Sequence, residues 1–484
     1  MTHSWGQVGQ RCRAVAAALA ARGIGRGDSV SVLAANGPEL FELHYAVPLT
    51  GAVLNTINTR LEPETVAYIL DHSDSVLVIV DAALVPLLSR AFVILGRTLP
   101  LIGMQDYEAL TAHPPMAWCL PEDEGQALAL NYTSGTSGRP KGVIYHHRGA
   151  YLMALGTVAG WSLPPHPTYL SVVPMFHCNG WNHPWAMAVV GAHLIFVREV
   201  TPANLLAAIA QHRVTHFGAA PIVLQMLAEQ ATQAFATPVK VLTAGAPPPP
   251  SVLEKAARLN LQVMQVYGLT ETYGHISQCL WQEDWDALPP EVQAERQALQ
   301  GVAFPMVEEI RVVDRATGRD VPMDGVTQGE IAIRGNTVMK GYYKDAPATA
   351  HPFQDGRFWS GDAAVVHPDG YIQIRDRLKD VIISGGENIS SVEVEAVLYR
   401  HPAVQTAAVV ARPHARWGES PCAFVELRPG AAATEAEIIA LCRDRIAHFK
   451  APKTVVFGAL PKTATGKIQK YLLRQAAREL GEQS

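Results

Sequence analysis

The sequence predicts an α/β protein in which a large, layered N-terminal part precedes a small α+β C-terminal unit. Through about the first 300 residues, short β-branched runs alternate with amphipathic helical stretches, which is typical of largely parallel sheets covered by helices. After about residue 300, glycine and aspartate become frequent and the strands shorten, which favours an antiparallel, barrel-like part. A length of 484 residues suggests about two to four domains, so the chain has room for all three parts.

The first amphipathic helix is predicted over residues 8–23, where apolar residues recur at helical spacing and Gly23 ends the pattern. Buried strands follow as β-branched runs, with helices between them. We predict the strands at 29–33, 75–80, 168–173 and 192–197, and the helices at 203–211 and 222–230. The four prolines at 247–250 predict a rigid connector before a helix that begins at Ser251.

The later part of the chain divides at a charged segment. Short strands at 309–313, 329–334 and 371–374 form the barrel-like part, and residues 375–380 (RDRLKD) then follow with few apolar side chains. We therefore predict two domains, residues 1–378 and 379–484. Within the second domain we expect helices at 392–399 and 435–446 and strands at 404–411 and 422–427.

Composition excludes several classes of protein. A net charge of −5, from 39 basic and 44 acidic residues mixed along the chain, gives no support for a nucleic-acid partner. The six cysteines lie far apart without a CxxC pair, so a reducing compartment is expected. The first residues lack the features of a secretory signal, and no apolar stretch reaches the roughly 18 residues of a membrane span. We therefore expect a cytoplasmic enzyme.

A loop rich in glycines and hydroxyl groups runs from Tyr132 to Gly142 (YTSGTSGRPKG) after an apolar strand. Its glycines permit close backbone approach, its N–H and hydroxyl groups can donate to a phosphate, and Lys141 adds a positive charge. A flexible Ser/Gly hairpin is the alternative on composition alone. The loop is not a Walker A motif, because GK[ST] is absent and residues 143–145 continue as a strand.

Five further motifs follow this loop in order along nearly the whole chain. They are Tyr267–Thr272 (YGLTET), Gly329–Glu330 with Lys340–Tyr342, Ser360–Asp362 (SGD), Arg375–Asp380 (RDRLKD) and Pro461–Lys467 (PKTATGK). Together the six motifs resemble the signature of the adenylate-forming superfamily, which includes acyl-CoA synthetases, luciferases and peptide-synthetase adenylation domains. This resemblance implies two α/β subdomains with a distorted β-barrel, a mobile C-terminal domain, and a requirement for ATP, Mg²⁺ and CoA.

The resemblance also implies roles for single residues, each of which would be an ordinary surface group if taken alone. Glu271 would bind Mg²⁺, a hard cation that prefers oxygen ligands, and Thr270 would donate to a phosphate oxygen. Asp362 would accept hydrogen bonds from the ribose hydroxyls beside Arg377. Lys467 would be catalytic, with its ammonium between the attacking carboxylate and the α-phosphate. The residues expected to bind the nucleotide are Thr133, Ser134, Gly135, Thr136, Ser137, Gly138, Lys141, Gly245, Ala246, Pro247, Tyr267, Gly268, Asp362 and Arg377.

Residues 173–181 (VPMFHCNGW) resemble the segment that lines the acyl site. Amino-acid-activating relatives carry an aspartate after this phenylalanine, whereas this chain carries His177. Without a buried carboxylate to pair with an ammonium, amino acids are disfavoured as substrates. Trp181, Val266 and Leu269 would line the pocket, and their apolar character suits a short-chain, medium-chain or aromatic acid. The resemblance implies a catalytic role for His177, and the alternative is an ordinary core histidine. No carboxylate or cysteine completes a metal site around the histidines.

For the second half-reaction, the resemblance places a hinge at Lys379 and directs Gly385, Gly386 and Trp417 toward CoA. The sequence thus predicts an acid–CoA ligase of fatty-acid or lipid metabolism that forms acyl-AMP and then acyl-CoA. Two alternatives stay open: a ligase that loads a carrier-protein phosphopantetheine, and a truncated, inactive nucleotide-binding relative. The resemblance further suggests an N-terminus shorter than is usual in the family and allows a homodimer. No nucleic acid and no membrane span are expected.

Overall fold

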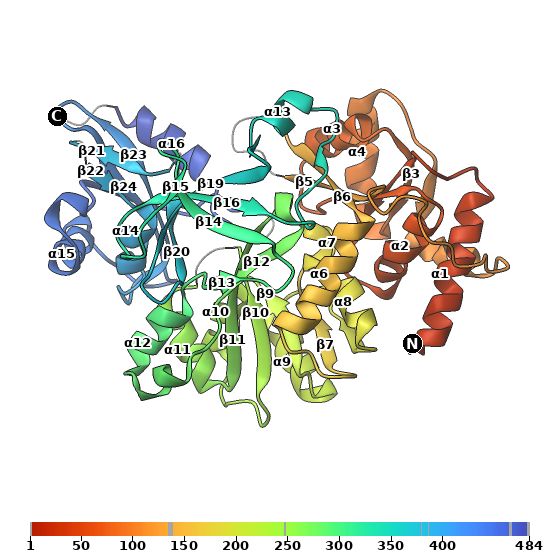
Figure 1. Ribbon diagram of the computed structural model, residues 1–484, viewed down its shortest axis with the longest axis horizontal. Helices are drawn as coiled ribbons and strands as arrows, with labels where there is room; N and C mark the ends of the chain where they lie inside the picture. Colours follow the sequence, from red (N-terminus) through yellow and green to blue (C-terminus); the bar gives the residue numbers. More distant parts are fainter. Residues whose placement is uncertain are drawn as a thin grey trace.

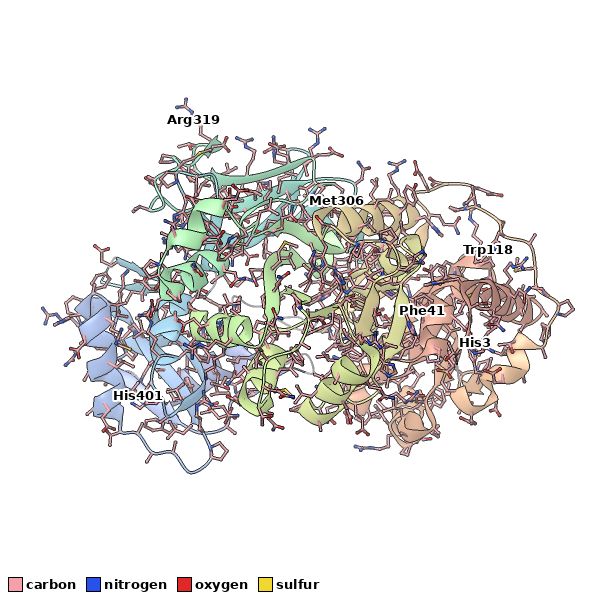
Figure 2. The ribbon with its side chains drawn as sticks, turned by 90° about the horizontal axis from the view of Figure 1, so that it is seen from below. His3, Phe41, Trp118, Met306, Arg319 and His401 are labelled. Carbon is pink, nitrogen blue, oxygen red and sulfur yellow. The ribbon has the colours of Figure 1, made fainter. Side chains whose placement is uncertain are left out.

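The computed structural model describes residues 2–133, 139–245, 248–378, 380–385, 387–463 and 467–481, with only the backbone of Asn388. The described strands form two sheets of seven strands, one of six and one of five. In Figure 1 the first sheet lies near the N-terminus, and the C-terminal unit, drawn in blue, lies at the opposite end. The side chains in Figure 2 show the same arrangement, with His401 at one end and His3 and Trp118 at the other.

The first sheet has the strand order β17-β6-β5-β2-β1-β3-β4. Strand β1 pairs in parallel with β2 and β3, and all five of its residues are buried, as expected of a central parallel strand. Strand β6 turns back antiparallel to β5. The strands are β1 (Ser29–Leu33), β2 (Val53–Thr56), β3 (Ser75–Val80), β4 (Leu101–Gly103), β5 (Ala127–Thr133), β6 (Lys141–His146) and β17 (Gly341–Tyr342), and the helices of this part are α1 (Trp5–Ala20), α2 (Pro38–Leu49), α3 (Pro63–His72), α4 (Val85–Leu95) and α5 (Tyr107–Thr111).

The second sheet has the order β13-β12-β11-β10-β9-β7-β8 and is parallel from β11 to β8. Strand β12 returns antiparallel to β11, so the two form a hairpin at the edge that approaches the third sheet. The strands are β7 (Thr168–Ser171), β8 (His193–Phe196), β9 (His216–Ala219), β10 (Val239–Thr243), β11 (Leu261–Leu269), β12 (Gly274–Gln278) and β13 (Val302–Ala303), and the helices are α6 (His147–Gly160), α7 (Cys178–Trp181), α8 (His183–Val189), α9 (Pro202–His212), α10 (Pro221–Gln230), α11 (Pro250–Arg258) and α12 (Pro290–Gln297).

The third sheet is antiparallel and curled, and its apolar side chains join the core of the first sheet. It contains β14 (Glu309–Asp314), β15 (Arg319–Asp320), β16 (Gly329–Arg334), β18 (Phe353–Gln354), β19 (Arg357–Val366) and β20 (Ile372–Arg377), with α13 (Ala346–Ala350) between β17 and β18. Strand β20 pairs with β19 and places Arg377 opposite Asp362. The β19–β20 pair therefore brings two predicted nucleotide residues, one on each strand, to one register position.

The C-terminal unit has a hydrophobic core of its own, centred on Ile382, Val409 and Val425. Strands β23 and β24 form a long antiparallel pair, and β25 adds in parallel to β24. The unit contains β21 (Ile382–Ser384), β22 (Glu387–Ile389), β23 (Val404–His414), β24 (Gly418–Leu427) and β25 (Thr454–Phe457), with α14 (Ser391–Leu398), α15 (Glu435–Arg445) and α16 (Lys470–Glu479). A separate core confirms the predicted fold class of a large α/β part and a small α+β domain.

Most predicted elements are confirmed, and two differ in an informative way. The helix expected over 8–23 spans Trp5–Ala20, because the Ser4 side chain caps its start and the chain leaves the helix before Gly23. The charged segment 375–380 was expected to be a boundary, yet its first three residues belong to β20. Their charges are tolerated in a strand because the side chains of Asp376 and Arg377 find partners there.

The described residues include no helix that combines the length and the apolar character that crossing a membrane requires.

We predict that Gly268→Ala destabilises the protein. A Cβ atom on Gly268 would lie 1.7 Å from the carbonyl oxygen of Gly274 across the β11–β12 hairpin, and this backbone cannot give way without opening the pair. The expected loss is about 1–3 kcal/mol in the free energy of unfolding, measured by urea denaturation. Gly458→Ala is the matched control, because no atom lies within 4 Å of its Cβ position. Equal stability of the two variants would contradict the prediction.

Candidate active site

A buried carboxylate joins the second and third sheets at the predicted nucleotide site. Asp362 is 3% exposed and receives a hydrogen bond from the hydroxyl of Tyr267, at the end of β11. The Nε of Arg377 lies 2.7 Å from the other oxygen of this carboxylate. Burial and the charge of Asp362 raise the pKa of Tyr267, so the phenol stays a neutral donor. Three predicted residues from three strands thus form one contact group.

The predicted metal ligand Glu271 lies in the turn between β11 and β12. Its Oε1 accepts a hydrogen bond of 2.7 Å from the hydroxyl of Tyr342 in β17, and the pKa of Tyr342 is raised by burial and by the charge of Glu271. The ammonium of Lys141 lies 4.8 Å from the centre of the Tyr342 ring. A half-buried carboxylate beside a lysine suits a magnesium ion that is held mainly by phosphates.

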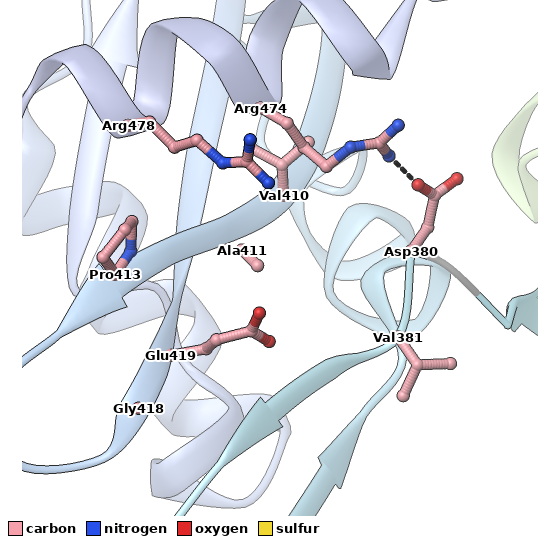
Figure 3. A pocket seen from close by; sticks show the side chains of 9 residues that line it. All are labelled: Asp380, Val381, Val410, Ala411, Pro413, Gly418, Glu419, Arg474 and Arg478. Atoms are coloured by element: carbon pink, nitrogen blue, oxygen red, sulfur yellow. Dashed lines mark hydrogen bonds and ion pairs between the residues drawn. The ribbon is translucent and has the colours of Figure 1, made fainter. Parts of the chain in front are cut away.

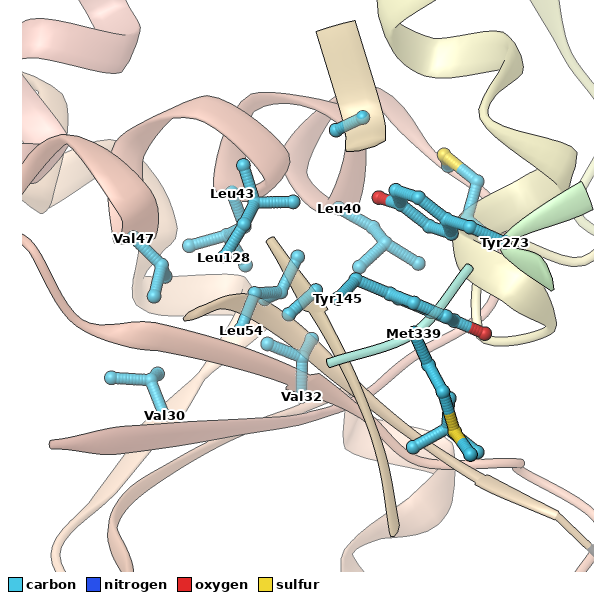
Figure 4. Close-up of a cluster of buried hydrophobic side chains, with 14 of the residues drawn as sticks. Val30, Val32, Leu40, Leu43, Val47, Leu54, Leu128, Tyr145, Tyr273 and Met339 are labelled. Carbon is cyan, nitrogen blue, oxygen red and sulfur yellow. The ribbon is translucent and has the colours of Figure 1, made fainter. Parts of the chain in front are cut away.

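Two side chains that the sequence analysis missed hold the same turn. The hydroxyl of Tyr145 donates to the carbonyl oxygen of Thr270 at 2.8 Å, and its ring stacks on Tyr273 at 3.7 Å. Figure 4 shows the two rings one against the other at the edge of the apolar core. The thiol of Cys178 donates to the hydroxyl of Thr270 at 3.6 Å. No local pattern signals these contacts, because Tyr145 and Cys178 lie far along the chain from Thr270.

Beside the turn, the backbone after His177 takes an unusual form. Residues 178–182 all have positive φ, between 41° and 64°, and four of the five are not glycine. Such a run costs energy and is found where a site requires it. The Oδ1 of Asn131, on β5, accepts from the N–H of Asn179 at 2.7 Å and so holds this turn against the first sheet.

The charge of the predicted catalytic lysine affects the same region. Burial, and to a smaller extent the positive charge of Lys467, lowers the pKa of His177 to about 4. The N–H of Lys467 donates to the hydroxyl of Thr463 at 3.1 Å, and the N–H of Thr463 donates to the carbonyl of Lys467 at 2.7 Å. These two bonds join Thr463 to Lys467.

Two of the three predicted acyl-pocket residues are buried in one apolar cluster. Val266 is fully buried and Trp181 is 7% exposed, and both pack in one apolar cluster with Phe304, whereas Leu269 is half-buried. The Trp181 ring also contacts the ring of His275 at 5.6 Å. Trp181 and Val266 therefore belong to the apolar core of this part of the chain.

The other predicted positions divide into described residues and residues outside the description. Thr133 and Lys141 pair across β5 and β6 and flank the glycine-rich loop, and Gly245 follows β10 with φ of 99°. Gly385 and Trp417 contact each other, with a hydrogen bond of 2.8 Å from the N–H of Gly385 to the carbonyl of Trp417. Ser134, Gly135, Thr136, Ser137, Gly138, Ala246, Pro247, Lys379 and Gly386 lie outside the described residues.

A cavity of about 360 Å³ lies within the C-terminal unit, next to the predicted hinge. Figure 3 shows that Arg474 and Arg478 of α16 face it, and that Arg474 pairs with Asp380 at its edge. None of the predicted site residues lines this cavity. The cavity is therefore separate from the predicted site residues Asp362, Glu271 and Lys467.

Family comparisons match both parts of the chain. A family model described as AMP-binding enzyme matches residues 1–343, and one described as AMP-binding enzyme C-terminal domain matches residues 393–467. A peroxisomal acetate/butyrate–CoA ligase of Arabidopsis thaliana is 46% identical, with 99% of this chain and 90% of the relative aligned. An acetate–CoA ligase (46%) and a 2-methylpropanoate–CoA ligase (44%) of Humulus lupulus each align over 99% of this chain and 91% of their own length.

Solved structures resemble the chain over its whole length. An o-succinylbenzoate CoA synthetase from Bacillus subtilis, in complex with its acyl-adenylate intermediate, matches with a TM-score of 0.86 and 26% identity, over 98% of this chain and 93% of that chain. The same enzyme in complex with ATP and magnesium ion matches with a TM-score of 0.82 and 26% identity, over 97% and 93% of the two chains.

Acidification should destabilise the protein because its core histidines are neutral. Burial lowers the pKa of His44, His216 and His275 from about 6.5 to about 4. The unfolded chain therefore binds protons more readily, and the stability that these residues contribute is present above pH 6.5 and is lost as the pH falls toward 4. Between pH 7.5 and pH 5 the loss should be roughly 2 kcal/mol per histidine, measured by urea denaturation. The His275→Gln variant should lose less stability than the wild type over this interval. An equal loss in both would contradict a contribution of His275 to the acid sensitivity.

Proposed function

We propose that this chain, which belongs to the AMP-binding enzyme family, is an ATP-dependent acid–CoA ligase. The reaction joins a carboxylic acid to AMP with release of pyrophosphate, and then moves the acyl group to the thiol of CoA with release of AMP. The observation that carries the proposal is the contact group of Tyr267, Asp362 and Arg377, with Glu271 in the turn that follows β11. The CoA-ligase relatives and the structure with ATP and magnesium support ATP, Mg²⁺ and CoA as the requirements.

The charges of the site suit the first half-reaction. Asp362 would accept from the ribose hydroxyls, and Arg377 would lie at the α-phosphate. Glu271 would hold the magnesium ion, which supplies charge neutralisation at the phosphates when bound. A carboxylate oxygen of the acid attacks the α-phosphorus while its bond to pyrophosphate breaks, and Lys467 stabilises the charge that develops there. The protein contributes position and electrostatics in this step.

The acid is proposed to be a short alkanoic acid of about two to five carbons. Three of the relatives are named for acetate, butyrate and 2-methylpropanoate. The buried apolar side chains of Trp181 and Val266 suit an uncharged alkyl tail. Neutral His177 offers no charge to a second carboxylate or to an amine.

The other predictions from the sequence remain proposals. We infer that residues 1–378 and 379–484 move relative to each other at Lys379, so that Gly385 and Trp417 approach CoA in the second half-reaction. A homodimer and a cytoplasmic location are also proposed. The name of one relative includes the word peroxisomal, so the location requires its own test by cell fractionation.

The substrate proposal is tested with a panel of acids. Acid-dependent ATP–pyrophosphate exchange and acyl-CoA formation should both occur with acetate, butyrate and 2-methylpropanoate, and kcat/KM should be at least tenfold lower for octanoate and benzoate. Absence of both reactions with every acid would overturn the function, and a preference for benzoate would overturn the acid class. Replacing CoA by a carrier protein tests the carrier-loading alternative, and any turnover excludes an inactive relative.

Lys467→Ala should separate the two half-reactions. Loss of the ammonium removes the charge that stabilises the attack on the α-phosphorus, so acyl-AMP formation should fall at least 100-fold. Conversion of preformed acyl-AMP and CoA to acyl-CoA should change by less than about threefold, because this step involves no attack on phosphorus. Stopped-flow or quench assays of each half-reaction measure the two rates. Equal loss in both would contradict the assigned role.

A further inference from the structure

A buried charge cluster lies just after the catalytic lysine in the chain. Lys470 is the first residue of α16, three residues beyond Lys467, and its side chain is 17% exposed. Its Nζ lies 2.8 Å from the carboxylate of Glu395 and donates to the hydroxyl of Ser391 at 2.5 Å. Burial disfavours the charged ammonium, but the carboxylates of Glu395 and Asp376 outweigh this effect, so the pKa of Lys470 is raised. Lys470 is therefore a charged group at the start of α16.

The same cluster attaches the C-terminal unit to the nucleotide side of the molecule. Asp376 lies on β20, is 2% exposed, and accepts from the N–H of Ser391 at 2.6 Å. The hydroxyl of Ser390 donates to the carbonyl of Arg375 in the same strand. The start of α14 is thus bonded to β20, the strand that carries Arg377.

The bonds between β20 and the start of α14 depend on how the two parts of the chain are arranged. Asp376 precedes the proposed hinge at Lys379, whereas Ser391 and Lys470 follow it. A rotation at the hinge would separate Asp376 from Ser391, so the complete cluster belongs to the arrangement in which the charge of Lys467 acts on His177. Stability alone does not explain the ion pair, because a buried pair often gives no more stability than apolar residues of the same size.

We propose that Lys470 is a positioning residue for adenylation: held by Glu395 and Ser391 against β20, it fixes the start of α16 and thereby places the ammonium of Lys467 in the active site. This inference rests on the proposed function. Adenylation is sensitive to such placement, because a displacement of about 1 Å can cost about 100-fold in rate. The second half-reaction does not require this placement, since the proposed rotation breaks the bonds that attach the start of α14 to Asp376 and Arg375 of β20.

The test compares both half-reactions in variants of the whole chain. Lys470→Met should lower the kcat of acid-dependent ATP–pyrophosphate exchange at least tenfold with little change in the KM for ATP, and should change acyl-CoA formation from preformed acyl-AMP by less than threefold. Lys470→Arg should restore at least a third of the exchange rate, because it keeps the charge. The double variant Lys470→Met with Glu395→Gln removes both charges of the ion pair, so it tests the rate if the single variant does not fold.

Lys450→Met is the matched control for adenylation. Lys450 also pairs with a carboxylate of α14, Glu393, at 2.8 Å, but it does not touch β20 or the start of α16. Its exchange rate should equal that of the wild type. Wild-type exchange rates in the double variant, or equal losses in both half-reactions, would overturn the positioning role. Absence of exchange in the wild type would overturn the proposed function instead, so the two failures are distinguishable.

Discussion

The carboxylate of Asp362 is the constraint on which the site depends. A buried charge of this kind is costly unless it is paired and hydrogen-bonded, and here Tyr267 supplies the hydrogen bond and Arg377 the opposite charge. The three residues come from β11, β19 and β20, so satisfying one carboxylate fixes the second sheet against the third. The turn that carries Thr270 and Glu271 follows directly from β11, and its position is set by the same contact.

Around this carboxylate the titratable groups divide into charged and neutral ones. In the proposed function, Lys141, Arg377 and Lys467 would bring positive charge to a site that must hold a polyanion and a carboxylate, and Glu271 would bring the oxygen ligand for a cation. Burial keeps Tyr267 and Tyr342 protonated and His177 neutral at physiological pH. The site therefore presents fixed charges and neutral donors, and it needs little reorganisation as charge develops on phosphorus.

The sequence predicted the helices and strands that depend on neighbouring residues. It did not predict the side-chain contacts between residues far apart in the chain. Strand β1 and helix α10 follow from apolar patterning. The six motifs were identified by their resemblance to a known superfamily, and the comparisons confirm the family. The roles given to single residues remain predictions, although the structure brings Asp362 and Arg377 together. The contacts of Tyr145 and Tyr342 could not be predicted, because each joins residues more than 70 positions apart. The extension of β20 through charged residues was missed because its partners lie in other elements.

The alternation of side chains along β20 connects the nucleotide site to the C-terminal unit. Successive residues of a strand point to opposite faces, so Arg377 turns toward Asp362 while Asp376 turns toward the start of α14. The proposed hinge follows two residues later. A rotation there can break the contact of Asp376 with Ser391 and leave the contact of Arg377 with Asp362 intact, because only the first pair spans the hinge. In the proposed rotation, Asp362 and Arg377 therefore keep their positions. The C-terminal unit, with Lys467, moves between the arrangement for adenylation and the arrangement for transfer to CoA.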